Sequence, residues 1–305
     1  MAAVSEQLAP LPMHELWSKD FELMHHYCTV TADTLSIRRE MRHVWRVVIP
    51  REGYQHPFVM HGILAIAATH KAYLVPNSRK KYLALSDYHQ TVGSEGFRST
   101  LSNVCVESQG ALFCFASVVV LFMFTLPTRS ATGRLENPVI NLLELIGLLK
   151  GMRATQSPVL PGILKSEFAP IIYGIWPIEQ TGPPAGQAEI PSASLKPYIG
   201  AIDRLEETAK LISCAGVHAE AGAVLAWMYG VDDSVLIDIG AYRPHALLTL
   251  AYYSLFLATL EKSFWYSRGW GRQLIDQIET KLAGQSKFLQ LFQWPKQKLT
   301  DLYRW

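Results

Sequence analysis

Cysteine is scarce in this sequence of 305 residues, and its placement excludes the usual zinc sites. The four cysteines, Cys28, Cys105, Cys114 and Cys214, contain no Cys-x-x-Cys pair, on which structural zinc sites usually depend. We therefore expect no bound metal and no disulfide framework, which favours a reducing compartment. Cys114 and Cys214 lie in apolar sequence, which predicts buried and unreactive thiols.

An excess of charge of one sign is also missing. The chain has 28 Lys and Arg against 26 Asp and Glu, a net charge of +2, and its basic residues are scattered. We expect no direct nucleic acid contact from this chain. The N-terminus has no signal pattern, and the longest apolar run, 111–126, is shorter than the roughly 20 residues of a membrane span. These features predict no membrane span and an intracellular location, cytoplasmic or nuclear.

Motifs of common catalytic chemistry are missing as well. There is no His-Glu-x-x-His and no Gly-x-Ser-x-Gly, and Gly93-Ser-Glu-Gly96 lacks the lysine and the preceding strand of a phosphate loop. Asp232-Asp233 lacks the further acid, at helical spacing, with which an isoprenoid synthase would hold magnesium. The sequence therefore predicts no cofactor and leaves the catalytic residues, if there are any, unknown.

Hydrophobic residues are plentiful, at 49%, and they recur with a helical period in one segment after another. No segment alternates as a strand would. We predict an all-α fold, a single compact multi-helix domain with an internal apolar pocket. The domain is expected to span residues 15–305 after a flexible tail at 1–14, with a proline-rich loop at 157–194.

The chain is organised around residues 246–299. An apolar helix from Ala246 leads to the aromatic run 264–266 and the turn Gly269-Trp270-Gly271. An amphipathic helix follows, with Leu274, Ile275, Ile278 and Leu282 on its apolar face. Trp294-Pro295 is predicted to end the next, short helix, because the residue before proline is pushed out of the α region.

A second notable stretch covers residues 54–70. It contains His56-Pro57-Phe58, with proline suited to a first helical turn, and Met60-His61-Gly62, and it ends at His70. The preceding segment, Trp45 to Pro50, is predicted to close at its proline. A helix at 79–101, bearing Tyr88 and His89, and a central buried helix at 111–126 are predicted to follow.

Two further helices are predicted together with their buried faces. The apolar side of the helix at 15–34 is expected to carry Leu16, Phe21, Met24, Tyr27 and Cys28. The helix at 139–152 is expected to bury Ile140, Leu143, Ile146, Gly147 and Met152.

In this order, these stretches resemble the regulatory domain of fungal zinc-cluster transcription factors of the sterol-uptake-control type. Members of that family carry a similar His-Pro-Phe helix, a following helix with Tyr and His, and a Gly-Trp-Gly turn before a Trp-Pro near the end. The resemblance covers about residues 15–299, more weakly through the proline-rich middle. It implies a helical domain that binds a sterol-like ligand.

The sequence departs from that family in one respect. A zinc-cluster regulator carries a six-cysteine, DNA-binding segment ahead of the regulatory domain, and no such segment is present here. Either the sequence is the regulatory domain alone, or it is a natural chain that has lost DNA binding. The two possibilities lead to different functions.

The aromatic side chains have two interpretations, plain core packing or the wall of a pocket for a hydrophobic ligand, with tyrosine hydroxyls and a histidine as polar handles. Tyr252 and Tyr253 point about 100° apart on a helix, so at most one can face the pocket centre. The candidate ligand-binding residues are Tyr252, Tyr253, Phe256, Trp265, Trp270, Trp227, Met228 and Phe122.

Two functions from different classes follow. The first is a regulatory module that binds a sterol-like or other hydrophobic small molecule and then changes its contacts with a partner or with a second copy in a homodimer. The second is a metal-free fungal biosynthetic enzyme, a cyclase or pericyclase resembling a Diels-Alderase, that orients a terpenoid or polyketide intermediate in the same pocket.

Overall fold

The computed structural model describes residues 13–156, 160–173 and 196–304. Every regular element in these ranges is helical and none is a strand, which confirms the predicted all-α fold. The α-helices run, in chain order, as α1 Met13–His26, α2 Arg39–His43, α3 Ile49–Gln55, α4 Pro57–Leu74, α5 Arg79–Leu101, α6 Gln109–Phe124, α7 Leu126–Arg129, α8 Pro138–Gln156, α9 Leu160–Ile163, α10 Ala169–Tyr173, α11 Lys196–Ala215, α12 Ala221–Gly230, α13 Asp233–Gly240, α14 Pro244–Leu260, α15 Trp270–Lys281 and α16 Ser286–Tyr303.

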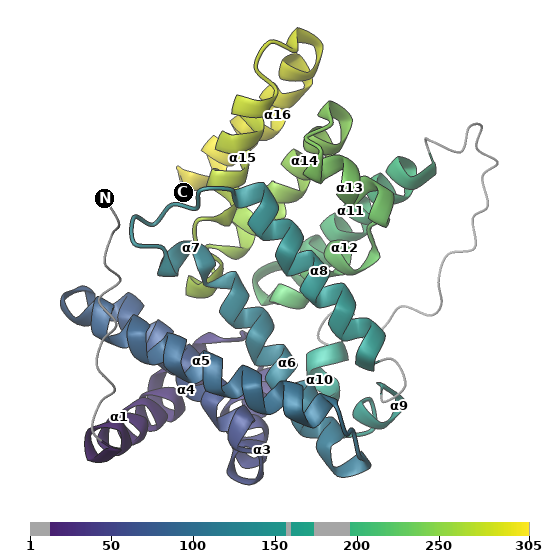
Figure 1. Cartoon of the computed structure of the whole chain (residues 1–305). Coiled ribbons are helices and arrows are strands. Elements are labelled where there is room, and N and C mark those ends of the chain that lie inside the picture. Colours follow the sequence, from purple (N-terminus) through teal and green to yellow (C-terminus); the bar gives the residue numbers. More distant parts are fainter. Residues whose placement is uncertain (1–12, 157–159, 174–195, 305) are drawn as a thin grey trace.

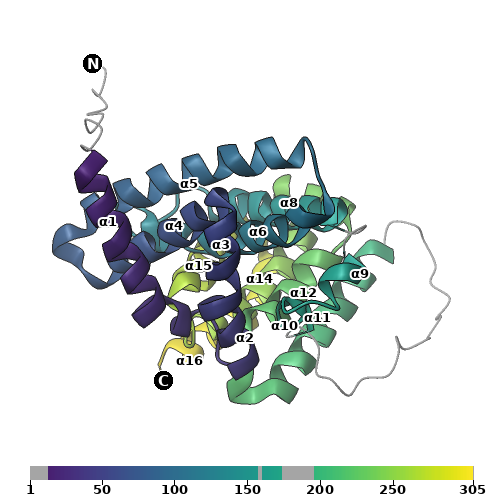
Figure 2. The same ribbon diagram turned by 90° about the horizontal axis from the view of Figure 1, so that it is seen from below.

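Helices α6 and α8 lie between two groups of helices (Figure 1). The N-terminal group, α1 to α5, covers one side of α6, and the C-terminal group, α11 to α16, packs against α8 and the far end of α6. The view in Figure 2 shows α5 along one edge of the molecule and α1 crossing at another. One continuous hydrophobic core joins the two groups.

Helix α6 is the central buried helix that the sequence predicted. Its residues are apolar on every side, and Cys114 and Phe124 are fully buried, so neighbours must cover it all round. By length and composition, the stretch Val106–Phe124 is the one described helix that could cross a membrane. However, 61% of that window is buried inside the domain, as expected of a core helix.

The two prolines that were predicted to end helices lie within helical runs. Pro50 lies in the first turn of α3, directly after a π-helical turn at Val44–Val48 that continues α2. Val48 is itself in the helical conformation, so the run continues through Pro50, which cannot donate the backbone hydrogen bond that another residue would make there. Pro295 lies inside α16, which continues to Tyr303, since Phe292 and Leu299 on the same helix are buried and outweigh one missing backbone bond. Both boundary predictions were wrong.

Two predicted helix faces also need correction. Phe21 was placed on the apolar side of α1, but 67% of its surface is exposed. In α8 the predicted Gly147 is exposed, Ile140 and Leu143 are only half-buried, and of the predicted face only Ile146 is fully buried. The buried residues of α8 are Val139, Leu142, Leu145, Ile146 and Leu149. Helix α8 is apolar nearly all round and lies between α6 and three C-terminal helices, so periodicity alone did not fix its face.

Outside the helices, the predictions are only partly covered by the structure. The predicted tail at 1–14 lies almost entirely outside the described residues, and α1 begins at Met13. Within the predicted loop at 157–194, α9 and α10 are helical, and 174–195 lie outside the described residues. Cys114 is buried as expected, whereas Cys214 is exposed at the end of α11, contrary to the prediction.

Glycine in α5 allows the N-terminal helices to approach α6 closely. A Cβ atom added at Gly93 would lie 2.7 Å from Cε2 of Phe115 and 3.1 Å from the carbonyl oxygen of Phe58. Gly93 therefore makes room for an aromatic ring from α6. Gly147 in α8 is the opposite case, because a Cβ there would meet nothing within 4 Å.

We expect Gly93→Ala and Gly147→Ala to change stability in opposite directions. At Gly93 the added methyl group overpacks the core, which outweighs the helix propensity gained and should lower the free energy of unfolding by about 1–2 kcal/mol. At Gly147 the propensity gain stands alone and should raise it by about 0.5–1 kcal/mol. Urea unfolding of the two variants measures this, and a stabilised Gly93→Ala protein would contradict the close packing.

Candidate functional site

Three of the predicted site residues form one aromatic cluster between α12 and α14. Trp227 stacks on Tyr253, with ring centroids 4.3 Å apart and an interplanar angle of 21°, and Phe256 meets Tyr253 edge-on at 6.3 Å. Trp227 and Tyr253 are fully buried, whereas Phe256 is half-buried. Met228, next to Trp227 on α12, is also fully buried.

Both polar ends of this cluster already have partners. The Trp227 Nε1–H donates to the carbonyl oxygen of Ala201 at 3.0 Å, and the Tyr253 hydroxyl donates to the carbonyl oxygen of Val224 at 3.1 Å. Burial raises the pKa of Tyr253 far above its ordinary value, so this hydroxyl stays neutral and acts as a donor. The cluster is therefore apolar, with one neutral hydroxyl at its edge.

Tyr252 lies in different surroundings from Tyr253, as the helical geometry predicted. Its ring stacks on Trp294 of α16, with centroids 5.3 Å apart, and Trp294 is itself 51% exposed. Tyr252 therefore belongs to an aromatic pair near the surface, whereas Tyr253 belongs to the core.

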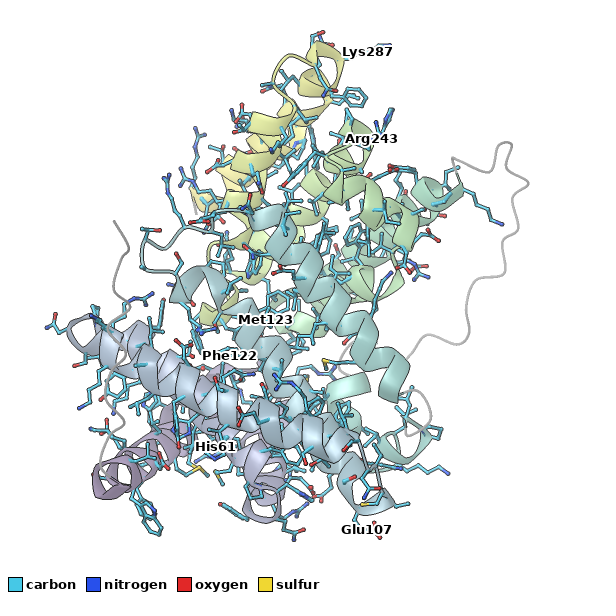
Figure 3. All side chains as sticks on the ribbon, in the orientation of Figure 1. His61, Glu107, Phe122, Met123, Arg243 and Lys287 are labelled. Atoms are coloured by element: carbon cyan, nitrogen blue, oxygen red, sulfur yellow. The ribbon has the colours of Figure 1, made fainter. Side chains whose placement is uncertain are left out.

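The remaining predicted residues are each held elsewhere. Trp265 stacks on His70 at 4.4 Å and donates to the hydroxyl of Thr34 at 3.0 Å. Trp270 is fully buried and donates to the carbonyl oxygen of Phe124 at 2.8 Å. Phe122, near the end of α6 (Figure 3), lies beneath the guanidinium of Arg129, 3.9 Å from its ring centre.

Two open grooves on the surface of the domain lie away from these residues. One, of about 480 Å³, runs between α2 and the segment around α10, and its lining includes Arg39, His43 and Glu167. The other, of about 490 Å³, lies where α7 leads into α8, and its lining includes Arg129 and Glu144. Neither groove is lined by any of the eight predicted site residues.

A polar cluster that sequence reasoning missed lies where α1 meets α4 and α5. The Nδ1 atoms of His61 and His89 are 2.9 Å apart, and the Nε2 atom of His89 lies 3.3 Å from Oδ1 of Asp20. His89 is completely buried and His61 is half-buried. The sequence singled out His61 and His89 through their helices, but nothing in it connected either one to Asp20.

An ionic cluster lies beside these histidines. Glu22 accepts hydrogen bonds from Lys19, Lys71 and the hydroxyl of Tyr82, the last at 2.6 Å. Burial opposes the charged form of Glu22, but these three donors outweigh it and lower its pKa to about 2. Glu22 is therefore ionised at any ordinary pH and ties α1 to α4 and α5.

Further along α4, His70 is buried against the continuation of α1. Its Nδ1 lies 3.0 Å from the hydroxyl of Thr31, and its ring lies 5.3 Å from that of His26. Burial, with a smaller contribution from His26, lowers the pKa of His70 to about 4. Burial likewise lowers the pKa of His26 and of His61.

In the described residues, no group of three His, Cys, Asp or Glu side chains is placed to hold a metal ion.

Comparison with known proteins gives two informative matches. No protein-family model matches the chain. The chain is 28% identical over 157 residues to Sterol uptake control protein 2 of Saccharomyces cerevisiae, a match covering 50% of this chain and 16% of the relative. It is 30% identical over 150 residues to Sterol uptake control protein 2 of Candida albicans, covering 49% and 20% respectively. The matched part thus spans a fifth or less of these relatives. Over about half of its own length, the chain is homologous to the fungal sterol uptake control proteins.

Proposed function

We propose that this chain acts as the regulatory domain of a fungal transcription regulator, in the nucleus or cytoplasm, and that a sterol-like molecule controls it. The observation that carries the proposal is the match to two sterol uptake control proteins. The all-helical fold agrees with the helical domain that the resemblance implies. A homodimer and the absence of direct nucleic acid contact stay predictions.

We place the ligand at the aromatic cluster of Trp227, Met228, Tyr253 and Phe256. These residues bring large apolar side chains together from two helices, and the Tyr253 hydroxyl, which donates to the carbonyl oxygen of Val224, can still accept a hydrogen bond from the hydroxyl of a sterol. The Trp227 and Tyr253 rings contact each other, so binding requires them to separate. Phe256 is half-buried at the edge of the cluster, and its rotation is the simplest way to open a path.

Titration of the purified chain with the fluorescent sterol dehydroergosterol tests this site. Phe256→Ala removes a wall of the proposed site and should weaken binding at least tenfold. Tyr253→Phe removes the hydroxyl inside the cluster and should weaken it about fivefold to tenfold, within the range of one hydrogen bond. Tyr252→Phe is the matched control, because it removes the same atom from the neighbouring ring that stacks on Trp294, and binding should change less than twofold.

Each outcome has a clear meaning. If dehydroergosterol binds all three variants as tightly as it binds the wild-type chain, the ligand site lies elsewhere. If wild-type protein binds no sterol, ligand control by sterols is wrong, whatever the homology says about the regulator. Conversion of an added polyene or terpenoid to a cyclised product would instead favour the pericyclase alternative, which stays a prediction.

A further inference from the structure

Helix α1 lies at the edge of the domain, where it packs against α4 (Figure 2). Its inner side contributes one fully buried residue, Leu23, and the partly buried Leu16 and Met24. Its outer side carries Trp17 and Phe21, which are 62% and 67% exposed and contact only each other among the aromatic rings described. Within Met13–His26 the apolar contact is therefore limited to these three side chains, so polar contacts also help to hold α1.

Those polar contacts centre on a chain of three groups from three helices. His61 of α4, labelled in Figure 3, meets His89 of α5 through their Nδ1 atoms, and the far side of His89 faces Asp20 of α1. The arrangement selects one tautomer for each ring. If the His61 Nδ1–H donates to His89, then His89 carries its proton on Nε2 and turns it toward the carboxylate. The opposite choice would point a lone pair of His89 at the anion.

The group of His61, His89 and Asp20 can accept only a limited number of added protons. A proton added to Nε2 of His61 leaves the Nδ1 contact intact and is attracted to Asp20. A second added proton would have to go to Nδ1 of His89, where two N–H groups would then face each other at 2.9 Å. While α1 is packed against α4 and α5, these three side chains therefore bind fewer protons than they would bind if α1 moved away.

The contact between α1 and its neighbours is also incompletely paired. Asp20 Oδ1 and His89 Nε2 are buried without good hydrogen-bond geometry, and so is Nε2 of His26 at the end of α1. Together these make up three of the seven such atoms found in the described residues. Buried polar groups without partners destabilise the arrangement that buries them, so this contact is a weak one.

We propose that α1 is a releasable helix, held by the His61–His89–Asp20 contact and freed when acid adds more protons to these three groups than their packed geometry accepts. Burial of the imidazoles of His26 and His70, on either side of the same contact, acts in the same direction because each is also held neutral. The ring of Tyr88, also on α5, lies beside those of both His61 and His89. Release would expose His89 of α5 and the side chain of His61 of α4 that meets it.

The ionic contacts of Glu22 oppose release, because Lys71 and Tyr82 keep their hold on it at mildly acidic pH. These side chains are partly exposed, with 20% and 29% of the Lys71 and Glu22 side chains accessible, so solvent and salt weaken the pair. Raising the salt concentration should therefore shift the release of α1 to a higher pH. This behaviour distinguishes release of one helix from a change confined to the histidines.

Hydrogen exchange followed by mass spectrometry at pH 7.5 and 5.5, corrected for the intrinsic pH dependence of exchange, tests the proposal. Protection of the α1 amides, residues 13–26, should fall at least tenfold more than protection of α14 and α15, which report global unfolding. In the double variant His61→Gln/His89→Gln the extra loss should shrink to less than threefold. The control His25→Gln, an exposed histidine on the same helix, should behave as wild type.

Asp20→Asn provides an independent readout if the double variant does not fold. It removes the charge that holds His89, so α1 should already exchange at least fivefold faster at pH 7.5 while α14 is unchanged. Equal losses of protection in α1 and α14 at pH 5.5 would show ordinary acid unfolding and overturn the proposal. An undiminished pH effect in the double variant, or an Asp20→Asn protein that protects α1 as wild type does, would overturn it as well.

Discussion

Replacing Trp270 by alanine is expected to lower the free energy of unfolding by about 3–5 kcal/mol. Trp270 is completely buried, and its ring meets Phe124 edge-on at 6.5 Å. Its Nε1–H donates to the carbonyl oxygen of Phe124 at the end of α6. Truncation therefore leaves a large cavity and takes a partner from a buried carbonyl group at the point where α15 meets the central helix.

Urea unfolding followed by circular dichroism at 222 nm measures this effect. Trp17→Ala is the matched control, since Trp17 is 62% exposed and its loss should change the free energy by less than about 0.5 kcal/mol. A Trp270→Ala variant that loses under 1.5 kcal/mol would mean that the Gly-Trp-Gly turn does not anchor the C-terminal helices.

The turn around Trp270 shows what sequence can predict well. Gly269 has a φ of +95°, a left-handed conformation that favours glycine. A Cβ at Gly271 would lie 2.7 Å from that of Ala258, and the Gly271 amide donates to Glu261 at 2.7 Å. All of these interactions lie within about 15 residues along the chain, so local pattern was sufficient. The sequence did not show that the hydroxyl of Tyr303, near the end of α16, would also donate to the Glu261 carboxylate beside this turn, at 2.9 Å.

Predictions failed where the deciding contacts come from distant parts of the chain. Helix α8 has apolar residues nearly all round, so only the positions of α6 and the C-terminal helices determine which are buried. Phe21 fits an apolar helical period, but no described element covers that side of α1. The sequence predicts a helix end at Pro295, but α16 continues beyond it because Phe292 and Leu299, on either side of the proline, are buried in the core.

The candidate site shows the same division. Helix geometry alone separated Tyr252 from Tyr253, and the structure places them against Trp294 and Trp227 respectively. The sequence could not show that Trp265 and Trp270 would pack apart from this cluster, because that depends on the path of the chain after α14. The contact of Asp20 with His89 has no local signal at all, since it joins two helices far apart in sequence.

Stability is expected to fall as the pH drops from about 6.5 to about 4, and His70 should account for a large share of this loss. Burial lowers the pKa of His70 from 6.5 to about 4, so between these values the unfolded chain is protonated at this ring and the folded chain is not. The unfolded state then binds more protons, which means that stability is fully present above pH 6.5 and is lost as the pH falls. At pH 4.5, two pKa units below the unfolded value, the loss from this group is roughly 2–3 kcal/mol.

The variant His70→Gln isolates this contribution. Gln can still bond the hydroxyl of Thr31 but cannot titrate, so the difference in unfolding free energy between pH 7.5 and 4.5 should be roughly 2 kcal/mol smaller than in wild type. The variant loses the stacking on Trp265 and should be less stable at pH 7.5, so the comparison rests on the pH dependence and not on absolute stability. His25→Gln, at an exposed position, should leave the pH dependence unchanged.

If His70→Gln shows the full wild-type loss, then His70 is not the buried neutral group that links stability to pH. The remaining histidines with lowered pKa values, His26 and His61, would then have to account for it.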